Sequence, residues 1–293
     1  KNRLDPTMSL MQGINAKVRK NPKRVIFAEG EDENMLKAAI EFGRNKLGTP
    51  ILIGAEKRIK EQLKNIGLDE NYKIEIVNST DKEKREKYVK HLYKRLQREG
   101  QLERDVDRLV RNERIAWGAS MIACKDADAM VTGNIRHYAA SIEKLKKVTD
   151  PRPGEEIFGM TMITLKGKTI LVADTNVQDF PSPQRLVKVS KSCVRVARLF
   201  GFDPKVAFLS HSTFGKPISK NTKHVRDAIE ILKKENVDFD FDGEMQPDVA
   251  LNPIYQEIYP FSKIVGNANI LIMPALHSAA ISTKLMKVFG GGK

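Results

Sequence analysis

Short apolar runs alternate with longer amphipathic stretches along the first half of the chain. Compact apolar runs, which are typical of buried strands, occur at residues 24–28, 49–54, 73–77 and 127–133. Helical spacing of apolar residues separates them, over residues 35–43, 58–63, 81–96 and 102–124. Strands that alternate with helices in this way favour a parallel sheet with helices on both faces.

A second α/β region is predicted after a break at residues 150–154, which are rich in proline and glycine. Apolar runs at 158–165 and 169–173 flank Lys166-Gly167-Lys168 and predict a hairpin. A helix is expected over 182–199, with Ser182 as N-cap. The remaining expected elements are strands at 206–209, 239–241 and 269–273 and a helix at 224–235.

The predicted fold class is therefore α/β, with two doubly wound lobes. We expect a linker or first helix over residues 1–20, a first lobe over 21–150 and a second lobe over 151–288. With 293 residues, of which 41% are hydrophobic, the chain is long enough to bury two cores of ordinary size.

The chain has a net charge of +14, but the distribution of the charges says more about its partners than the sum does. A basic balance can indicate nucleic acid, an anionic membrane or a phosphorylated ligand, or only lysines spread over the surface. In the densest basic stretch, residues 82–114, acids and bases alternate at helical spacing, as in the pair Glu83 and Lys87. Aromatic residues are only 6% of the chain and offer few platforms for stacked bases. No nucleic-acid partner is expected.

The chain shows no sign of export or of membrane insertion. Two cysteines, Cys124 and Cys193, are too few for a disulfide framework, and both fall on apolar helical stretches that predict core positions. No apolar run approaches the roughly 20 residues of a membrane span. The first twenty residues also lack the apolar stretch of a signal peptide. The predicted location is the cytoplasm, with no membrane partner.

Polar loops rich in glycine or in hydroxyl side chains follow several expected strands. They lie at residues 29–32, 132–136, 210–215 and 242–248. In open α/β sheets ligands bind at the carboxyl ends of the strands, where hydroxyls and backbone amides suit a phosphate or a pantetheine amide. Such loops are also ordinary turns, and this alternative stays open for each of them.

Familiar catalytic patterns are missing from the sequence. It contains no nucleophile elbow, no P-loop and no dinucleotide-binding glycine motif. A triad of Ser210, His211 and Asp242 is disfavoured because adjacent residues on a strand point to opposite faces. The five histidines lack metal-ligand spacing; His91 is expected to be solvated and His277 to be a structural residue at a strand end. We assign no catalytic residue and no metal ligand.

Six stretches in register resemble the phosphate acetyl/butyryltransferase family. They are residues 27–33, 126–133, 173–177, 209–213, 225–228 and 242–250. The variants of these motifs, together with residues 2–7, 158–160, 180–181, 259–261 and 273–279, are most similar to the C-terminal phosphotransacetylase-like region of bacterial NADP-dependent malic enzymes. The resemblance spans nearly the whole chain.

This resemblance implies a cleft between the two lobes that takes coenzyme A-type ligands, and a homodimer formed through the second lobe. In active transferases a final segment returns to the first lobe with a Ser-Arg pair and an Asp, so residues 289–293 are expected to be a truncated return. The parent malic enzyme would form a higher oligomer and hold NADP and a divalent metal in a catalytic part absent here. The residues expected to bind acetyl-CoA or coenzyme A are Thr132, Gly133, Asn134, Arg136, Ser210, Ser212, Thr213, Asp242 and Gln246.

Two departures from the family bear on catalysis. Glu143 and Leu96 stand where the active family has arginines. Arginines clamp the phosphate and offset charge in the transition state, whereas a carboxylate would repel it. Arg136, Arg152 or Arg226 could act as substitutes, but the sequence does not place them.

These observations predict a regulatory and oligomerisation domain of an NADP-dependent malic enzyme, whose parent chain decarboxylates malate oxidatively to pyruvate. The domain would bind acetyl-CoA as an effector without efficient acetyl transfer. An active phosphate acetyltransferase and a purely structural dimerisation module remain as alternatives.

Overall fold

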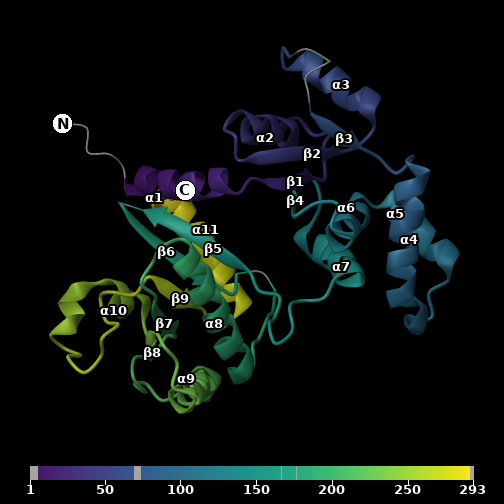
Figure 1. Cartoon of the computed structure of the whole chain (residues 1–293). Helices are drawn as coiled ribbons and strands as arrows, with labels where there is room; N and C mark the ends of the chain where they lie inside the picture. Colours follow the sequence, from purple (N-terminus) through teal and green to yellow (C-terminus); the bar gives the residue numbers. More distant parts are fainter. Residues whose placement is uncertain (1–5, 69–73, 166, 176, 291–293) are drawn as a thin grey trace. The chain divides into compact units, whose positions relative to one another are not determined.

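The computed structural model in Figure 1 describes residues 6–68, 74–165, 167–175 and 177–290. Parts of several expected features lie outside these described residues, namely residues 2–5, Lys73, Lys166, Asn176 and residues 291–293. Contacts within the chain divide it into two units, one of Gly13–Asp150 and one of Lys1–Gln12 with Pro151–Lys293. The domain limits and the cleft expected from the sequence stay predictions.

The unit Gly13–Asp150 is built on a four-stranded parallel sheet with the order β3-β2-β1-β4. Its strands are β1 (Lys23–Phe27), β2 (Gly48–Ile53), β3 (Glu75–Val77) and β4 (Ala129–Val131). Its helices are α2 (Glu33–Arg44), α3 (Glu56–Asn65), α4 (Lys82–Leu96), η1 (Gln97–Glu99), α5 (Glu103–Asn112), α6 (Arg114–Ala123) and α7 (Tyr138–Val148), and α1 (Pro6–Lys20) runs into it.

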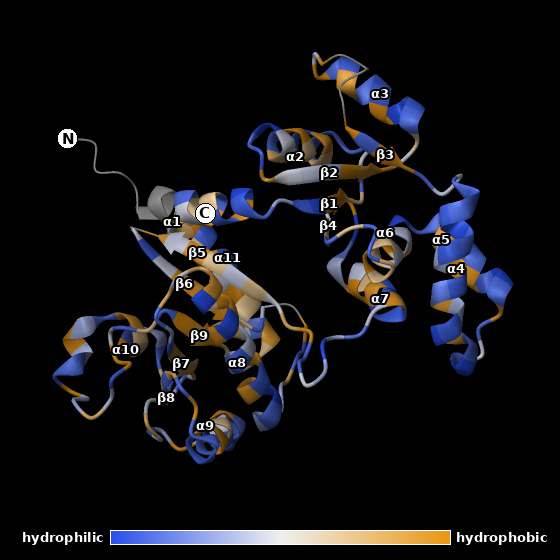
Figure 2. Ribbon diagram, in the orientation of Figure 1, coloured by the Kyte–Doolittle hydropathy of each residue, from blue (hydrophilic) through white to orange (hydrophobic). Residues whose placement is uncertain are grey.

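Alternate residues of these strands pack against different helices. Phe27 and Leu52 contribute to a cluster with α2 and α3, which includes Leu36. Ile26 and Ile51 belong to a second cluster with α4, α5 and α6. This arrangement confirms the predicted parallel sheet with helices on both faces. Figure 2 shows α4 mostly hydrophilic, as expected for a solvated helix with a narrow apolar stripe.

The unit that contains Pro151–Lys293 has a five-stranded sheet with the order β5-β6-β9-β7-β8. Strands β5 and β6 form the predicted antiparallel hairpin, and the other neighbours are parallel. The strands are β5 (Met160–Leu165), β6 (Lys168–Ala173), β7 (Lys205–Leu209), β8 (Asp240–Met245) and β9 (Ile270–Ile272). The helices are α8 (Pro183–Leu199), η2 (Lys220–Thr222), α9 (Lys223–Glu235), α10 (Pro247–Leu251), η3 (Pro253–Gln256) and α11 (Leu276–Gly290).

The second sheet is likewise covered on both faces. Val206 and Phe208 belong to a cluster with α8 and α9, whereas Ala207 and Leu209 belong to one with α10 and α11. Strands β7 and β9 are strongly hydrophobic in Figure 2. Cys193 lies within the α8 cluster, as predicted, and burial raises the pKa of its thiol.

Local capping fixes the start of two helices where the sequence predicts it. The Ser182 hydroxyl accepts a hydrogen bond from the Arg185 amide at 3.2 Å, and Pro183 occupies the first turn of α8. Asp81 accepts from the Lys84 amide at 3.1 Å at the start of α4. Because a capping side chain satisfies an otherwise unpaired amide, both boundaries can be recognised in the sequence.

Two expectations about element boundaries are wrong. A single helix over 102–124 is expected, but Glu113 has an extended backbone (φ −114°, ψ 105°) and separates α5 from α6. Strand β8 is expected to end at residue 241, but it continues to Met245, so Asp242 lies in a strand and not in a loop. Pairing with Ala207 and Phe208 of β7 supplies the backbone partners that this polar stretch needs. In addition, the helices α7 and α11 form over 138–148 and 276–290, where the sequence predicts no helix.

The first contact of β2 with β1 requires glycine. Gly48 pairs with Lys23, and a Cβ at Gly48 would lie 2.2 Å from the Lys23 carbonyl oxygen and 2.9 Å from the Phe42 ring. We expect Gly48→Ala to lower the free energy of unfolding by roughly 2 kcal/mol or more, measured by urea denaturation. Gly13→Ala is the control, because nothing lies within 4 Å of that Cβ and alanine favours the helix. Wild-type stability of Gly48→Ala would contradict this account.

Candidate functional site

A pocket of about 950 Å³ lies at the carboxyl ends of β7 and β9, within the unit that contains Pro151–Lys293. Leu209 and Ser210 line it where β7 ends, and Met273 lines it where β9 ends. Phe180 and Pro181 contribute to its apolar wall. Its position is the one at which open α/β sheets bind their ligands.

The polar wall of the pocket carries bases and hydroxyl groups. Its nitrogen-bearing side chains include Lys220, Lys223, His211, His224 and His277. The Lys223 ammonium pairs with Asp227, which also lines the pocket, at 2.6 Å. Among the described residues, no arginine lines this pocket. Its basic wall can therefore attract phosphates, but without the bidentate grip of a guanidinium group.

The histidines differ from each other in their surroundings. His91 is exposed on α4, as predicted. His277 is expected to be a structural residue at a strand end, and this is wrong. It is exposed in the first turn of α11, with its ring 5.7 Å from the ring of Phe180. His224 has its Nε2 atom 3.0 Å from the carbonyl oxygen of Pro274.

A buried glutamate holds the loop that follows β7. Glu244, in β8, is 1% exposed, and its Oε1 atom accepts hydrogen bonds from the Ser212 hydroxyl at 3.0 Å and the Gly215 amide at 2.9 Å. The Arg226 guanidinium approaches the same oxygen at 3.3 Å. Because a buried carboxylate is costly unless it is hydrogen-bonded and paired, this cluster fixes the conformation of the loop.

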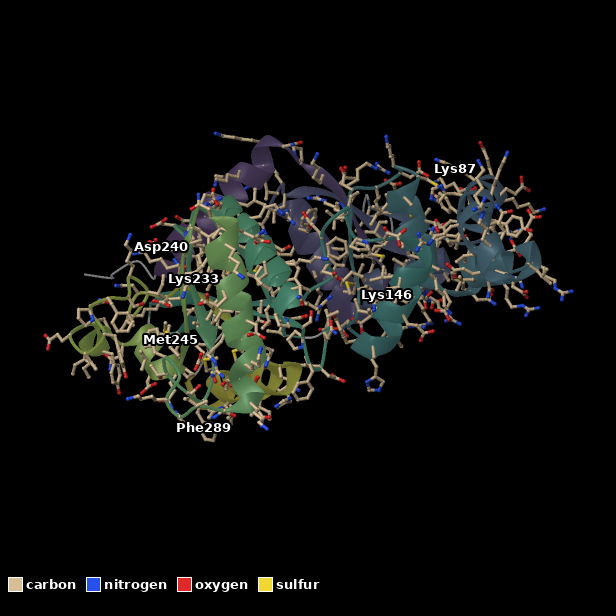
Figure 3. All side chains as sticks on the ribbon, turned by 90° about the horizontal axis from the view of Figure 1, so that it is seen from below. Lys87, Lys146, Lys233, Asp240, Met245 and Phe289 are labelled. Carbon is tan, nitrogen blue, oxygen red and sulfur yellow. The ribbon has the colours of Figure 1, made fainter. Side chains whose placement is uncertain are left out.

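Four of the five residues expected at this edge are linked by hydrogen bonds. Ser210 and Ser212 have their hydroxyl oxygens 3.2 Å apart. The Gln246 side-chain amide donates to the His211 carbonyl at 2.7 Å, and the Gln246 backbone amide donates to the Thr213 hydroxyl at 3.2 Å. The fifth residue, Asp242, lies in β8, and its carboxylate accepts from the adjacent Gly243 amide at 2.8 Å. Met245, which lies between Glu244 and Gln246, is labelled in Figure 3.

The unit Gly13–Asp150 contains a similar arrangement. Glu29 follows β1, is 2% exposed, and accepts from the Thr132 hydroxyl at 3.1 Å and the Gly133 amide at 3.0 Å. The Asn134 side-chain amide donates to Asp32 at 2.6 Å. The Arg136 guanidinium pairs with Glu113 at 2.9 Å. All four residues expected here therefore have partners in the unit itself.

Glu31 in the neighbouring loop is held as an anion. Burial alone would raise its pKa, but hydrogen bonds from the Ala55 amide and from Arg114 and Arg58 outweigh burial and lower the pKa below its usual value. The Arg114 ion pair has a length of 2.7 Å. This carboxylate therefore serves to join the loop to α3 and α6.

Glu29, Glu113 and Glu244 are not among the site residues expected from the sequence. The available signal is an acidic residue next to glycine at the end of a strand, as in Glu29-Gly30 and Gly243-Glu244. Acidic residues near strand ends are usually exposed, so the pattern alone does not indicate burial.

Within the described part of the chain, no group of three or more His, Cys, Asp or Glu side chains is placed to hold a metal ion. No helix among the same residues is both long and apolar enough to cross a membrane.

Comparison with known proteins gives the family. Residues 9–293 match the model of the phosphate acetyl/butaryl transferases. The chain belongs to this family. It is 43% identical to the NADP-dependent malic enzyme of Rhizobium meliloti over 99% of the chain, and it spans only 38% of that relative's length. It is 30% identical to the phosphate acetyltransferase of Clostridium acetobutylicum, covering 98% of this chain and 88% of that enzyme.

A solved structure supports the phosphotransacetylase-like fold that the sequence predicts. The phosphotransacetylase from Streptococcus pyogenes superimposes with a TM-score of 0.85 at 26% identity, over 98% of this chain and 87% of that one. The α/β fold of the phosphate acetyl/butaryl transferase family is thus present in both units.

The two positions at which the resemblance implies arginines in the active transferases differ in their environment. Leu96 is 2% exposed and packs in the core of the unit Gly13–Asp150. Glu143 is 72% exposed and pairs with Lys147 at 3.4 Å on the surface of α7. Of the possible substitutes, Arg136 and Arg226 are already paired with carboxylates, and Arg152 is exposed.

Position 96 lies in a hydrophobic core cluster, where a longer and charged side chain is unfavourable. We expect Leu96→Arg to lower the free energy of unfolding by roughly 2 kcal/mol or more, because a longer, charged side chain would replace a leucine packed against Tyr88 and Leu92. Glu143→Arg, on the surface, should change it by no more than about 0.5 kcal/mol. Both effects are measured by urea denaturation. A Leu96→Arg variant with the wild-type midpoint would show that position 96 can face solvent.

Proposed function

We propose that this chain is a regulatory and oligomerisation domain of an NADP-dependent malic enzyme, and that it binds acetyl-CoA without efficient acetyl transfer. The observation that carries the proposal is the pocket at the ends of β7 and β9, with hydroxyl, histidine and lysine side chains but no arginine among its described lining residues. The likeness to malic enzymes along 99% of the chain supports the parent assignment.

The pocket has the chemistry that a coenzyme A ligand needs. Its apolar wall of Phe180, Leu209 and Met273 suits the pantetheine arm, and Lys220 suits a phosphate. The first residues of α9 and α11 line the same space, and helix N-termini favour the binding of phosphate groups. The expected residues Ser210, Ser212, Thr213 and Gln246 belong to this wall or to its support.

Acetyl transfer to phosphate makes a stricter demand than binding. A second anion must approach the thioester carbonyl, and guanidinium groups normally hold it there. The resemblance to the active transferases implies arginines at two positions where this chain has Leu96 and Glu143. Arg226, a possible substitute, is held by Glu244. An active transferase remains the second candidate, because a phosphate acetyltransferase is 30% identical over nearly the whole chain.

In this proposal NADP, a divalent metal and malate belong to the catalytic part of the parent chain, which decarboxylates malate to pyruvate in the cytoplasm. Acetyl-CoA regulates that reaction if it binds two arrangements of the parent protein with different affinities.

Binding of acetyl-CoA is the direct test. We expect calorimetry to show saturable binding below about 1 mM, with Lys220→Met weakening it roughly threefold to tenfold through loss of a phosphate contact. Lys233→Met is the matched control, because Lys233 lies on α9 outside the pocket and pairs with Glu230. Its position is labelled in Figure 3.

An assay of acetyl transfer with the same protein distinguishes the two candidate functions. We expect no acetyl phosphate formation from acetyl-CoA and phosphate at the typical enzymatic rate of about 10 per second. Turnover at that rate would establish the transferase and contradict the regulatory proposal. Binding without turnover supports it, and the absence of both favours the purely structural alternative.

We also propose a homodimer formed through α11. Ile281, Leu285, Val288 and Phe289 form a stripe at helical spacing, and all four are at least half exposed. Figure 3 labels Phe289 near the end of this helix. Homodimer interfaces are more apolar than the rest of a protein surface, so a second copy fits this stripe.

A charge on this stripe should separate the subunits. We expect Val288→Glu to convert a dimer to a monomer in light scattering, since burying an unpaired carboxylate outweighs the gain of the interface. Ile218→Glu, at an exposed apolar residue that is not part of the α11 stripe, should leave the mass unchanged. A wild-type chain that is monomeric at high concentration would overturn the dimer.

A further inference from the structure

A chain of hydrogen bonds connects a buried carboxylate to the wall of the pocket. It runs from Glu244 through the hydroxyl of Ser212 to the hydroxyl of Ser210. All three residues are buried, and Ser210 is the member that lines the pocket. Through this series of hydrogen bonds, Glu244 determines which way the hydroxyl proton of Ser210 points at the place where a ligand would lie.

The donor and acceptor roles in this series are set by the Oε1 atom of Glu244. This oxygen faces three donors, namely the Ser212 hydroxyl, the Gly215 amide at 2.9 Å and the Arg226 guanidinium at 3.3 Å. The amide and the guanidinium can only donate, so the oxygen that they share acts as an acceptor. The single proton of the Ser212 hydroxyl is thus committed to Glu244.

The next link follows from this commitment. The 3.2 Å contact between the two serine oxygens needs one proton, and Ser212 has none left. Ser210 therefore donates its own proton to Ser212. The Ser212 backbone amide donates back to the Ser210 oxygen at 3.3 Å and occupies one of its two lone pairs.

We infer that Glu244 and Ser212 set Ser210 as an acceptor-only group in the pocket, so that the ligand atom bound to Ser210 must be a hydrogen-bond donor. The inference rests on the proposed function, because within acetyl-CoA it selects an amide N–H of the pantetheine arm over a carbonyl or phosphate oxygen. Glu244 and Ser212 act through Ser210 and are positioning residues. A site whose polar groups are fixed in this way rejects ligands that lack the matching proton.

The test compares acetyl-CoA with two analogues, in each of which one pantetheine amide N–H is replaced by an ester oxygen. In calorimetry the wild-type chain should bind one analogue roughly tenfold more weakly, because a hydrogen bond is lost and two lone pairs face each other. Ser210→Ala should bind acetyl-CoA and that analogue with equal affinity.

Ser212→Ala tests whether the preference depends on the orientation of the Ser210 hydroxyl proton or only on the presence of Ser210. It leaves the Ser210 proton free to turn towards the pocket, so the preference for acetyl-CoA should fall to within about threefold. Ser190→Ala is the matched control: Ser190 is a buried serine in α8 whose hydroxyl donates to the Val187 carbonyl, away from the pocket lining. It should keep the full preference.

Two results would overturn the inference. One is equal affinity of the wild-type chain for acetyl-CoA and both analogues, and the other is an unchanged preference in Ser212→Ala. If the wild-type chain binds none of the three ligands, the proposed function fails. The inference is then tested only by the orientation of the two serine hydroxyl protons. In the NMR spectrum of the free chain, assigned with the two alanine variants, a Ser212 proton directed to Glu244 supports it, and the reverse order overturns it.

Discussion

Two buried carboxylates determine how the strand-end loops are built. Glu29 and Glu244 each accept hydrogen bonds from a hydroxyl group and a backbone amide of the loop after a neighbouring strand. A carboxylate removed from water must find such donors, since its desolvation otherwise costs several kcal/mol. The loops therefore require a serine or threonine and an unhindered amide at fixed positions, and the polar edge of each sheet takes its form from this demand.

The two units meet the demand to different degrees. Glu244 has an additional partner in Arg226, whose guanidinium also binds Thr222 and the Ser219 carbonyl. In the other unit, the second oxygen of Glu29 is buried without a hydrogen-bond partner among the described residues. A buried acceptor without a donor typically costs about 1–3 kcal/mol. The loop after β7 is thus the more firmly held of the two, which suits the edge where the pocket lies.

The sequence predicts those elements whose cause is local. Strand β1 and helix α8 follow from an apolar run and from the Ser182 cap, so each can be recognised without knowing its neighbours. Strand β8 and the break at Glu113 depend on partners distant in sequence, namely β7 for the strand and Arg136 and Lys144 for the Glu113 carboxylate. The loops are recognised for the same reason as β1, but the glutamates that hold them are not, because burial of a charge leaves no local pattern.

Burial of Leu96 has a consequence for the substitutions that this position accepts. The side chain fills space between α4 and the helices around it, together with Tyr88, Leu92 and Val106. A packed interior does not yield to one larger residue at a time, so a longer side chain at position 96 would require several of these neighbours to change as well. Position 96 is therefore coupled to its neighbours in the core, so that its size can change more easily together with theirs than alone.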